Sequence, residues 1–145
     1  MMKKRLTSLA LSAMMVLSMV PATAFAAKDA GTPPTYNSAT GCYEISTPAQ
    51  LLYLAGKWKD GAPRDGHYVL TADIDMTGVK GSKPIASKKA EGFTGTFDGQ
   101  FHSIKGLRVE YEKKYAGLFG YVGNQNDQAY IKNVALLDCY VTGQQ

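Results

Sequence analysis

Apolar residues recur with two different spacings along this chain of 145 residues. From Pro48 to Trp58 they return every three or four positions, as they do on one face of a helix. Thr47 can cap this helix, and Gln50 completes a capping box. Most later apolar residues stand in short runs rich in Val, Ile, Thr and Tyr and bounded by glycine, which is typical of strands. The pattern predicts a mainly β domain with one short amphipathic helix.

Two hexads share their apolar positions at an offset of 27 residues (104 to 131): Ile104–Val109 and Ile131–Leu136. An offset of this size is typical of a solenoid in which each repeat forms one turn. The first and fourth residues of a hexad cannot face the same side of one straight strand, so the chain must bend between them. Gly106 and Asn133 stand at that bend and accept a left-handed backbone at low cost. Strands that meet at such corners predict a right-handed parallel β-helix.

A less regular third instance runs from Tyr68 to Met76, and the stretch from Val79 to Glu91 is expected to be a solvated loop. The first turn of a solenoid exposes strand edges, and we expect the preceding helix to cap them. No comparable cap follows the last hexad. The chain is therefore expected to be a β-helix fragment that is incomplete at its C-terminal side.

The N-terminal segment has the layout of a secretory signal peptide. Three cations, Lys3 to Arg5, precede an apolar run from Leu6 to Val20, and Ala24-Phe25-Ala26 supplies small residues for cleavage after Ala26. A membrane anchor is the alternative, but it needs about 20 apolar residues. The sequence predicts export followed by cleavage, with no membrane span in the mature chain.

These features divide the chain into three parts. Residues 1–26 are the signal peptide, residues 27–40 are a flexible leader rich in Gly, Pro, Ser and Thr, and residues 41–145 hold the helix and the first turns. The signal peptide removes three of the sixteen Lys and Arg residues, which leaves 12 acids and a net charge of +1 on the mature chain. We therefore expect no nucleic-acid partner.

Cys42 and Cys139 are the two cysteines of the chain. An exported protein meets an oxidising environment, in which they could form a disulfide that closes a long loop. The alternation of Cys139 with Leu137 and Val141 instead favours two buried thiols that behave as small apolar side chains.

Several segments resemble a known family: Phe93–Ile104, Gly117–Val122, Ile131–Val134 and Val141–Gly143. They are similar to the GLUG-type repeats of bacterial cell-surface β-helix proteins. The resemblance implies a scaffold, because such repeats occur in large adhesin-like surface proteins and in the non-catalytic parts of some immunoglobulin-cleaving metallopeptidases. The chain departs from the family in holding only about one full GLUG unit.

Few residues suggest chemistry. Asp98 and His102 could be an acid and base pair, but Asp98-Gly99 is a turn signal and His102 has the parity of an inward-facing, hydrogen-bonded residue. Asp73 and Asp75 face the same side of one strand and could bind Ca²⁺ or line an acidic cleft, although Ca²⁺ takes about six to eight oxygens. His67 stands alone.

Glycine-rich segments 92–99 and 117–120 lack the ending of a phosphate loop and are interpreted as corners. Five tyrosines could offer exposed rings for stacking on sugars, although packing is the simpler account: Tyr111, Tyr115, Tyr121, Tyr130 and Tyr140.

The sequence thus predicts no catalytic, cofactor or metal site. It favours a secreted or cell-surface structural and binding module, adhesin-like, whose partner is a host protein, matrix or glycan. Two alternatives stay open. The chain could be the non-catalytic N-terminal part of a larger extracellular enzyme, either a metallopeptidase or a carbohydrate-active β-helix enzyme, or a protein that covers its open end by end-to-end self-association.

Overall fold

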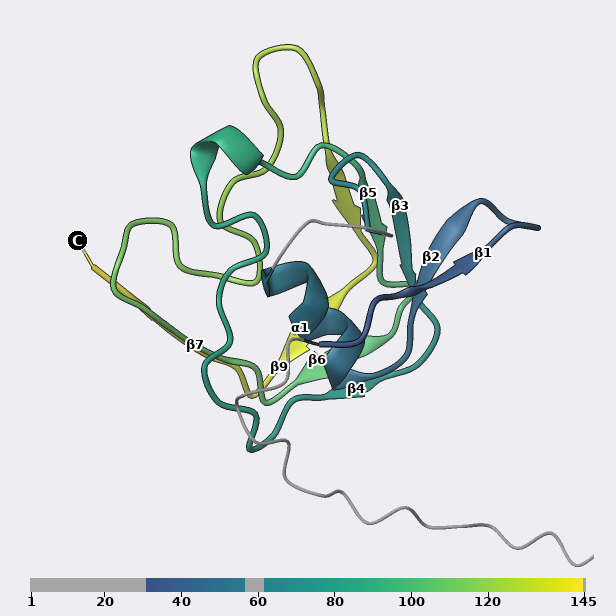
Figure 1. The fold of residues 1–145 in the computed structure, drawn as a ribbon. Helices are drawn as coiled ribbons and strands as arrows, with labels where there is room; N and C mark the ends of the chain where they lie inside the picture. The colour runs from purple at the N-terminus through teal and green to yellow at the C-terminus, as the bar shows by residue number, and fades with distance from the viewer. Residues whose placement is uncertain (1–30, 57–61, 145) are drawn as a thin grey trace, which may run out of the picture.

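The computed structural model describes residues 31–56 and 62–144 (Figure 1). The predicted signal peptide, its cleavage point after Ala26 and the predicted helix end at Trp58 lie outside these residues. The described chain is mainly β, as expected. Its elements are β1 (Thr35–Asn37), β2 (Cys42–Ile45), α1 (Pro48–Gly56), β3 (His67–Leu70), β4 (Ile74–Asp75), the 3-10 turn η1 (Lys89–Glu91), β5 (Thr96–Asp98), β6 (Ser103–Lys105), β7 (Arg108–Tyr111), β8 (Tyr130–Lys132), β9 (Ala135–Leu137) and β10 (Tyr140–Gly143).

The strands form three short sheets. The first has the order β1-β2-β3-β5-β8, the second pairs β7 with β10, and the third has the order β4-β6-β9. Every pair is parallel except β1 with β2, which makes the first sheet mixed. None of these sheets closes into a barrel.

The prediction of a right-handed parallel β-helix is wrong: the described residues form these separate short sheets and no regular solenoid. The 27-residue repeat also fails as a guide to pairing. Ile104 pairs with Leu136, which lies 32 residues later, and Ile131 pairs with Phe97. The hexads match because both contain the same bend, whereas pairing depends on the unequal stretches of chain between the strands.

The local part of that prediction is confirmed. Gly106 and Asn133 both have positive φ, at 66° and 53°, so the chain does bend within each hexad. The pattern predicted for Tyr68–Met76 is also confirmed. Tyr68 before the bend between β3 and β4 is buried, and so are Ile74 and Met76 after it.

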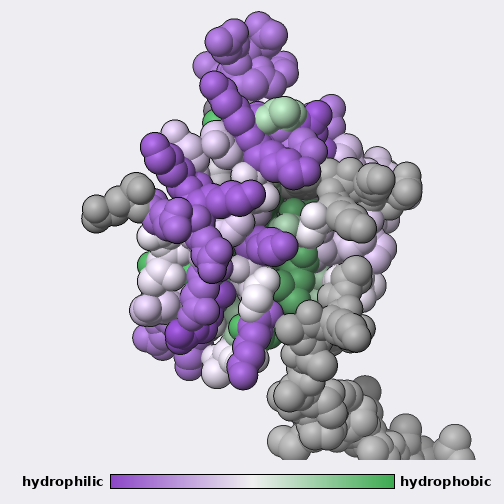
Figure 2. All heavy atoms as spheres, turned by 60° about the vertical axis from the view of Figure 1, so that its left-hand side comes forward, coloured by the Kyte–Doolittle hydropathy of each residue, from purple (hydrophilic) through white to green (hydrophobic). Residues whose placement is uncertain are grey.

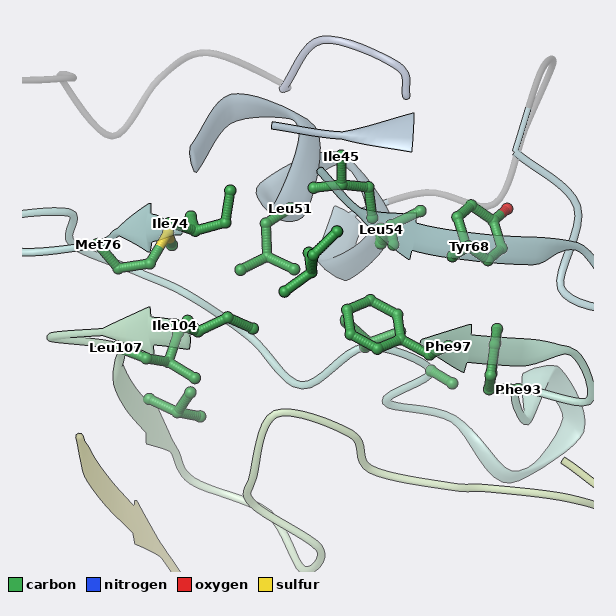
Figure 3. Packing of buried hydrophobic residues seen from close by; sticks show 14 of the residues in the cluster. Ile45, Leu51, Leu54, Tyr68, Ile74, Met76, Phe93, Phe97, Ile104 and Leu107 are labelled. Carbon is green, nitrogen blue, oxygen red and sulfur yellow. The ribbon is translucent and has the colours of Figure 1, made fainter. Parts of the chain in front are cut away.

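Helix α1 begins as its sequence predicts. The backbone N–H of Gln50 donates to the hydroxyl of Thr47 at 3.3 Å, and the side-chain carbonyl of Gln50 accepts from the backbone N–H of Ser46 at 2.8 Å. The helix differs from the prediction in its place, because β1 and β2 precede it. Its Leu51 and Leu54 are buried in the core between the sheets (Figure 3).

One apolar cluster fills the space between the three sheets and α1. Tyr68, Phe93 and Phe97 are its largest fully buried side chains (Figure 3). Val79 and Ile85 belong to the same cluster, so the stretch expected to be a solvated loop is partly packed. Apolar side chains within an otherwise charged stretch explain the difference, since their burial stabilises the fold.

The expected flexible leader also differs, because Thr35–Asn37 forms β1 at the edge of the first sheet. The side-chain amide of Asn37 donates to Glu44 at 2.7 Å, and the ring of Tyr36 lies 4.9 Å from that of Tyr43. Strand pairing and an aromatic contact order a segment whose composition alone predicts flexibility.

The last strand of each sheet leaves large apolar side chains exposed. We call β8, β9 and β10 the terminal strands. Their partners β5, β6 and β7 hold the buried Phe97, Ile104 and Val109. The terminal strands instead carry apolar side chains that are between 39% and 59% exposed: Tyr130, Ile131, Leu136, Leu137, Tyr140 and Val141.

The two cysteines are free thiols. Cys42 belongs to β2 in the first sheet, and its thiol lies 3.5 Å from the carbonyl of Thr40. Cys139 lies between β9 and β10, with its thiol 3.3 Å from the carbonyl of Leu137. The sequence left a disulfide and two unpaired thiols as alternatives. The structure has two unpaired thiols, and each is half-buried.

Candidate functional site

The structure separates Asp98 from His102, which were considered as an acid and base pair. Asp98 accepts hydrogen bonds from the backbone N–H of Gln100 at 2.9 Å and from the Asn133 amide at 3.1 Å, and it pairs with Lys132 at 3.2 Å. The N–H of Gln100, followed by the Asn133 and Lys132 side chains, holds the pKa of Asp98 below its ordinary value. Asp98 therefore has the predicted turn-forming role.

His102 instead lies beside Asp73, with 3.4 Å between its Nδ1 and the Asp73 carboxylate. The same carboxylate accepts hydrogen bonds from the backbone N–H of Ser103 at 2.7 Å and from its hydroxyl at 3.2 Å. The Ser103 N–H and hydroxyl, and then His102, lower the pKa of Asp73. His102 is hydrogen-bonded as expected, but its side chain is 35% exposed and so only partly packed.

Asp73, His102 and Ser103 combine the residue types of a catalytic triad without its arrangement. In a triad the serine hydroxyl donates to the histidine, which in turn is oriented by the carboxylate. Here the hydroxyl of Ser103 donates to Asp73 itself. The Ser103 hydroxyl is therefore linked to Asp73 directly, and not through His102.

Asp75 forms a turn of its own and does not share a ligand site with Asp73. Its carboxylate accepts from the backbone N–H of Thr77 at 2.9 Å, and the Thr77 hydroxyl and N–H together lower its pKa. Within residues 31–56 and 62–144, no three His, Cys, Asp or Glu side chains gather closely enough to hold a metal ion. The Asp73 and Asp75 pair thus has no third His, Cys, Asp or Glu ligand among the described residues.

A cleft of about 780 Å³ forms where three bends of the chain meet, and we call it the corner cleft. Because β4, β6 and β9 are parallel neighbours, the segments that leave them emerge at the same edge of the sheet. These segments are 77–81, 106–108 and 138–140, and Glu110 of β7 completes the lining. Positive φ at Gly78, Gly81, Gly106 and Asp138 turns the chain at this edge.

Three side chains of the corner cleft hold one another in place. Arg108 donates from Nε to one carboxylate oxygen of Glu110 at 2.7 Å, and its Nη2 forms an ion pair with the same oxygen at 2.6 Å. Its guanidinium also lies 4.5 Å from the centre of the Tyr140 ring, as in a cation–π contact. We call these three residues the Arg108 cluster.

Register explains how the Arg108 cluster assembles. Arg108 and Glu110 stand two positions apart on β7 and therefore face the same side of the strand. Strand β10 pairs with β7 so that Tyr140 lies opposite Arg108. The alternation of Arg108 and Glu110 is visible in the sequence and could have marked them, whereas the position of Tyr140 depends on a pairing that the sequence does not reveal.

A second cleft, of about 530 Å³, lies at the start of β3, β5 and β8, and we call it the loop cleft. It is lined by Arg64, Asp65, Thr94, Asn124, Asn126, Asp127 and Gln128. Several of these groups bond to neighbouring chain: Asn124 donates to Asp127 at 2.9 Å, and Arg64 donates to the carbonyl of Ala90 at 2.9 Å. The loop cleft is polar and has no aromatic side chain in its lining.

The remaining candidates have structural places. His67 begins β3 and is exposed. The glycine-rich segment 92–99 is not a corner, because it contains β5 and a bridge at Phe93. A Cβ at Gly95 or Gly99 would lie within 2.3 Å of a backbone oxygen of a neighbouring segment, so these glycines allow close stacking of the chain. Of the five tyrosines, Tyr115, Tyr130 and Tyr140 are exposed, while Tyr111 packs against the core. Figure 2 shows a largely hydrophilic face with a narrow apolar strip.

Comparisons with known proteins give one similarity. No protein-family profile matches the chain, and no solved structure matches it. Within the described residues no helix has the length and apolar character needed to cross a membrane. The chain is similar to Halomucin of Haloquadratum walsbyi, with 32% identity over an alignment of 109 residues; the match covers 70% of this chain and 1% of Halomucin.

Proposed function

We propose that the chain is a secreted or cell-surface binding module with no catalytic role of its own. The corner cleft is the observation that carries this proposal. It is open, it is built on three strand ends, and its exposed charged and aromatic groups are fixed relative to one another. Binding sites commonly combine such a concave surface with a few oriented polar groups.

Two features of the sequence support the location outside the cell. The N-terminal segment has the charge, apolar run and small residues of a cleaved signal peptide. The segments that resemble GLUG-type repeats support membership of a group of bacterial surface proteins, and the chain is similar to a small part of the much longer Halomucin.

Export is tested by expressing the full chain in a bacterial host and determining the N-terminal residue of the protein recovered outside the cytoplasm. We expect Ala27 at the N-terminus. Lys3→Glu, Lys4→Glu and Arg5→Glu together should keep the chain in the cytoplasm, since they remove the charge that precedes the apolar run. Recovery of the unaltered chain only in the cytoplasm, still beginning at Met1, would contradict the location.

Binding is tested by applying the mature protein, residues 27–145, to arrays of glycans, extracellular-matrix proteins and host-cell surfaces. Saturable binding to at least one class is expected, and heat-denatured protein is the control. If folded protein binds none of the three classes, the binding role is wrong.

A further inference from the structure

We infer that the corner cleft binds uncharged pyranose units of a glycan, with Tyr140 as the stacking surface and the Arg108–Glu110 pair as the hydrogen-bonding edge. This inference rests on the proposed binding role and assigns it a site and a ligand class. Three observations support it: the side chains of the Arg108 cluster are held in place, they have unused hydrogen-bond donors and acceptors, and the lining of the cleft has no net charge.

The Arg108 cluster is ordered before any ligand arrives. Arg108 and Glu110 are both more than half exposed, yet the hydrogen bond and ion pair between them and the contact with Tyr140 hold the guanidinium on two sides. Long exposed side chains usually lose conformational entropy when a ligand binds. A cluster that is already held in place avoids much of that loss, which favours binding.

The same cluster keeps hydrogen-bonding capacity for a ligand. Arg108 uses Nε and Nη2 on a single oxygen of Glu110, and an arginine has further N–H donors. The second carboxylate oxygen of Glu110 and the hydroxyl of Tyr140 form no hydrogen bond with any other described residue. Donors and acceptors thus stand side by side, which matches neighbouring hydroxyl groups on a sugar ring, since each hydroxyl both donates and accepts.

Tyr140 supplies the apolar surface that a pyranose needs. The residue remains 49% exposed although Arg108 lies over its ring. One face of a pyranose ring carries mainly C–H groups, and such a face packs well on an aromatic ring. The buried Val79 and Leu107 extend this apolar surface into the floor of the cleft.

The charges of the cleft favour an uncharged ligand. Lys80 and Arg108 are balanced by Glu110 and Asp138, so the lining has no net charge. With two cations and two carboxylates in the lining, neither an anionic nor a cationic ligand has a clear net attraction to compensate for the loss of its hydration. The volume of about 780 Å³ lies within the range of about 300–1,000 Å³ that small-ligand sites occupy.

The experiment is calorimetric titration of the mature protein with neutral oligosaccharides: cello-, xylo-, malto- and chito-oligosaccharides. Sulfated and uronate-containing oligosaccharides and inorganic phosphate form the anionic arm. We expect binding in the neutral arm and a Kd increased at least about tenfold by Tyr140→Ala, with much smaller loss for Tyr140→Phe, which keeps the ring. Tyr130→Ala is the matched control, because Tyr130 is a similarly exposed tyrosine on a terminal strand outside the corner cleft.

A second variant keeps the inference falsifiable if Tyr140→Ala unfolds the protein. Arg108→Met keeps much of the length of the side chain but removes its donors, and we expect it also to weaken neutral glycan binding about tenfold. Glu110→Gln separates the ligand classes: it should weaken a neutral glycan and strengthen an anion.

The outcomes distinguish this inference from the proposed function. Glycan binding that Tyr140→Ala and Arg108→Met leave unchanged overturns the site and leaves the binding role standing. Binding only to anions, or only to matrix or host proteins, overturns the ligand class. Absence of binding to every class contradicts the proposed function as well.

Discussion

At the scale of single residues, the bends of this chain depend on positions with positive φ. Gly106 has φ of 66°, and a Cβ added there would lie 2.5 Å from the hydroxyl of Thr77 and 3.0 Å from its backbone nitrogen. Gly78 has φ of 79°, but a Cβ there would meet nothing within 4 Å. The two glycines thus share a backbone requirement and differ in the space around them.

We predict that Gly106→Ala destabilises the fold more than Gly78→Ala. Both variants force an alanine into the left-handed region, which costs about 1–2 kcal/mol, and only Gly106→Ala adds a close contact with Thr77. The urea concentration at half-unfolding measures the difference. Equal shifts in the two variants would mean that Thr77 moves aside without cost.

Asp98 gives a prediction about acid stability. Its pKa is lowered in the folded state, chiefly by the N–H of Gln100, so its carboxylate stabilises the fold above the unfolded pKa of about 3.9, and that contribution is lost as pH falls through the lower folded value. Asp98→Asn should therefore be less stable than the parent at pH 6 and approach it near pH 2. Urea unfolding across this range tests the sign.

The control for Asp98→Asn is Asp138→Asn. Asp138 directly follows β9 and has φ of 50°, and no side-chain hydrogen bond joins its carboxylate to another described residue. Its replacement should lower the stability at pH 6 less than Asp98→Asn does. A gap between parent and Asp98→Asn that stays constant from pH 6 to pH 2 would refute the role of the charge.

At the scale of elements, the sequence predicted what is local and failed where pairing is distant. Helix α1 was predictable because Thr47, Gln50, Leu51 and Leu54 lie within one short segment. The bends at Gly106 and Asn133 were predictable because residue type alone favours them. Strand partners were not predictable, because the match between the two hexads reflects their shared bend and says nothing about which strand lies beside which.

The candidate site also combines local features that the sequence predicts with a distant pairing that it does not predict. Tyr140 could be named as an exposed aromatic, and Arg108 and Glu110 alternate visibly on one strand. Their meeting in the Arg108 cluster depends on the pairing of β7 with β10. That pairing joins residues 32 positions apart (108 to 140), and no local pattern specifies it.

The cap of α1 gives the prediction at this scale. Thr47→Ala removes the hydroxyl that accepts from the N–H of Gln50 and should reduce the free energy of unfolding by about 1 kcal/mol. Thr47→Ser keeps the hydroxyl and is the matched control. Denaturant unfolding followed by circular dichroism tests both, and equal stability of the two variants would show that the hydroxyl contributes nothing.

At the scale of the whole molecule, the terminal strands expose an apolar surface that their partner strands bury. Side chains such as Leu136 and Val141 are nearly half exposed, and the outer edges of β8, β9 and β10 have no partner strand among the described residues. Exposed apolar strand edges favour association with another chain. The terminal strands also carry little charge, since Lys132 is their one charged residue and it pairs with Asp98 at 3.2 Å.

We predict that the mature protein associates in a concentration-dependent way through these strands. Leu136→Lys combined with Val141→Lys should shift the molar mass measured by light scattering toward the monomer, because facing lysines repel. His67→Lys with Thr71→Lys adds the same charge at exposed positions outside the terminal strands and should change the mass little. A parent protein that is monomeric at all concentrations would contradict this expectation.

The parallel pairing of distant strands also affects the folding rate of the chain. Tyr43 pairs with Tyr68 after 25 residues, and Phe97 pairs with Ile131 after 34. Each such pair must close a long loop before its contacts stabilise anything, so folding is expected in the slow range of about milliseconds to seconds. For the export that we propose, slow compaction keeps the chain extended for longer, which favours passage through a narrow secretion channel.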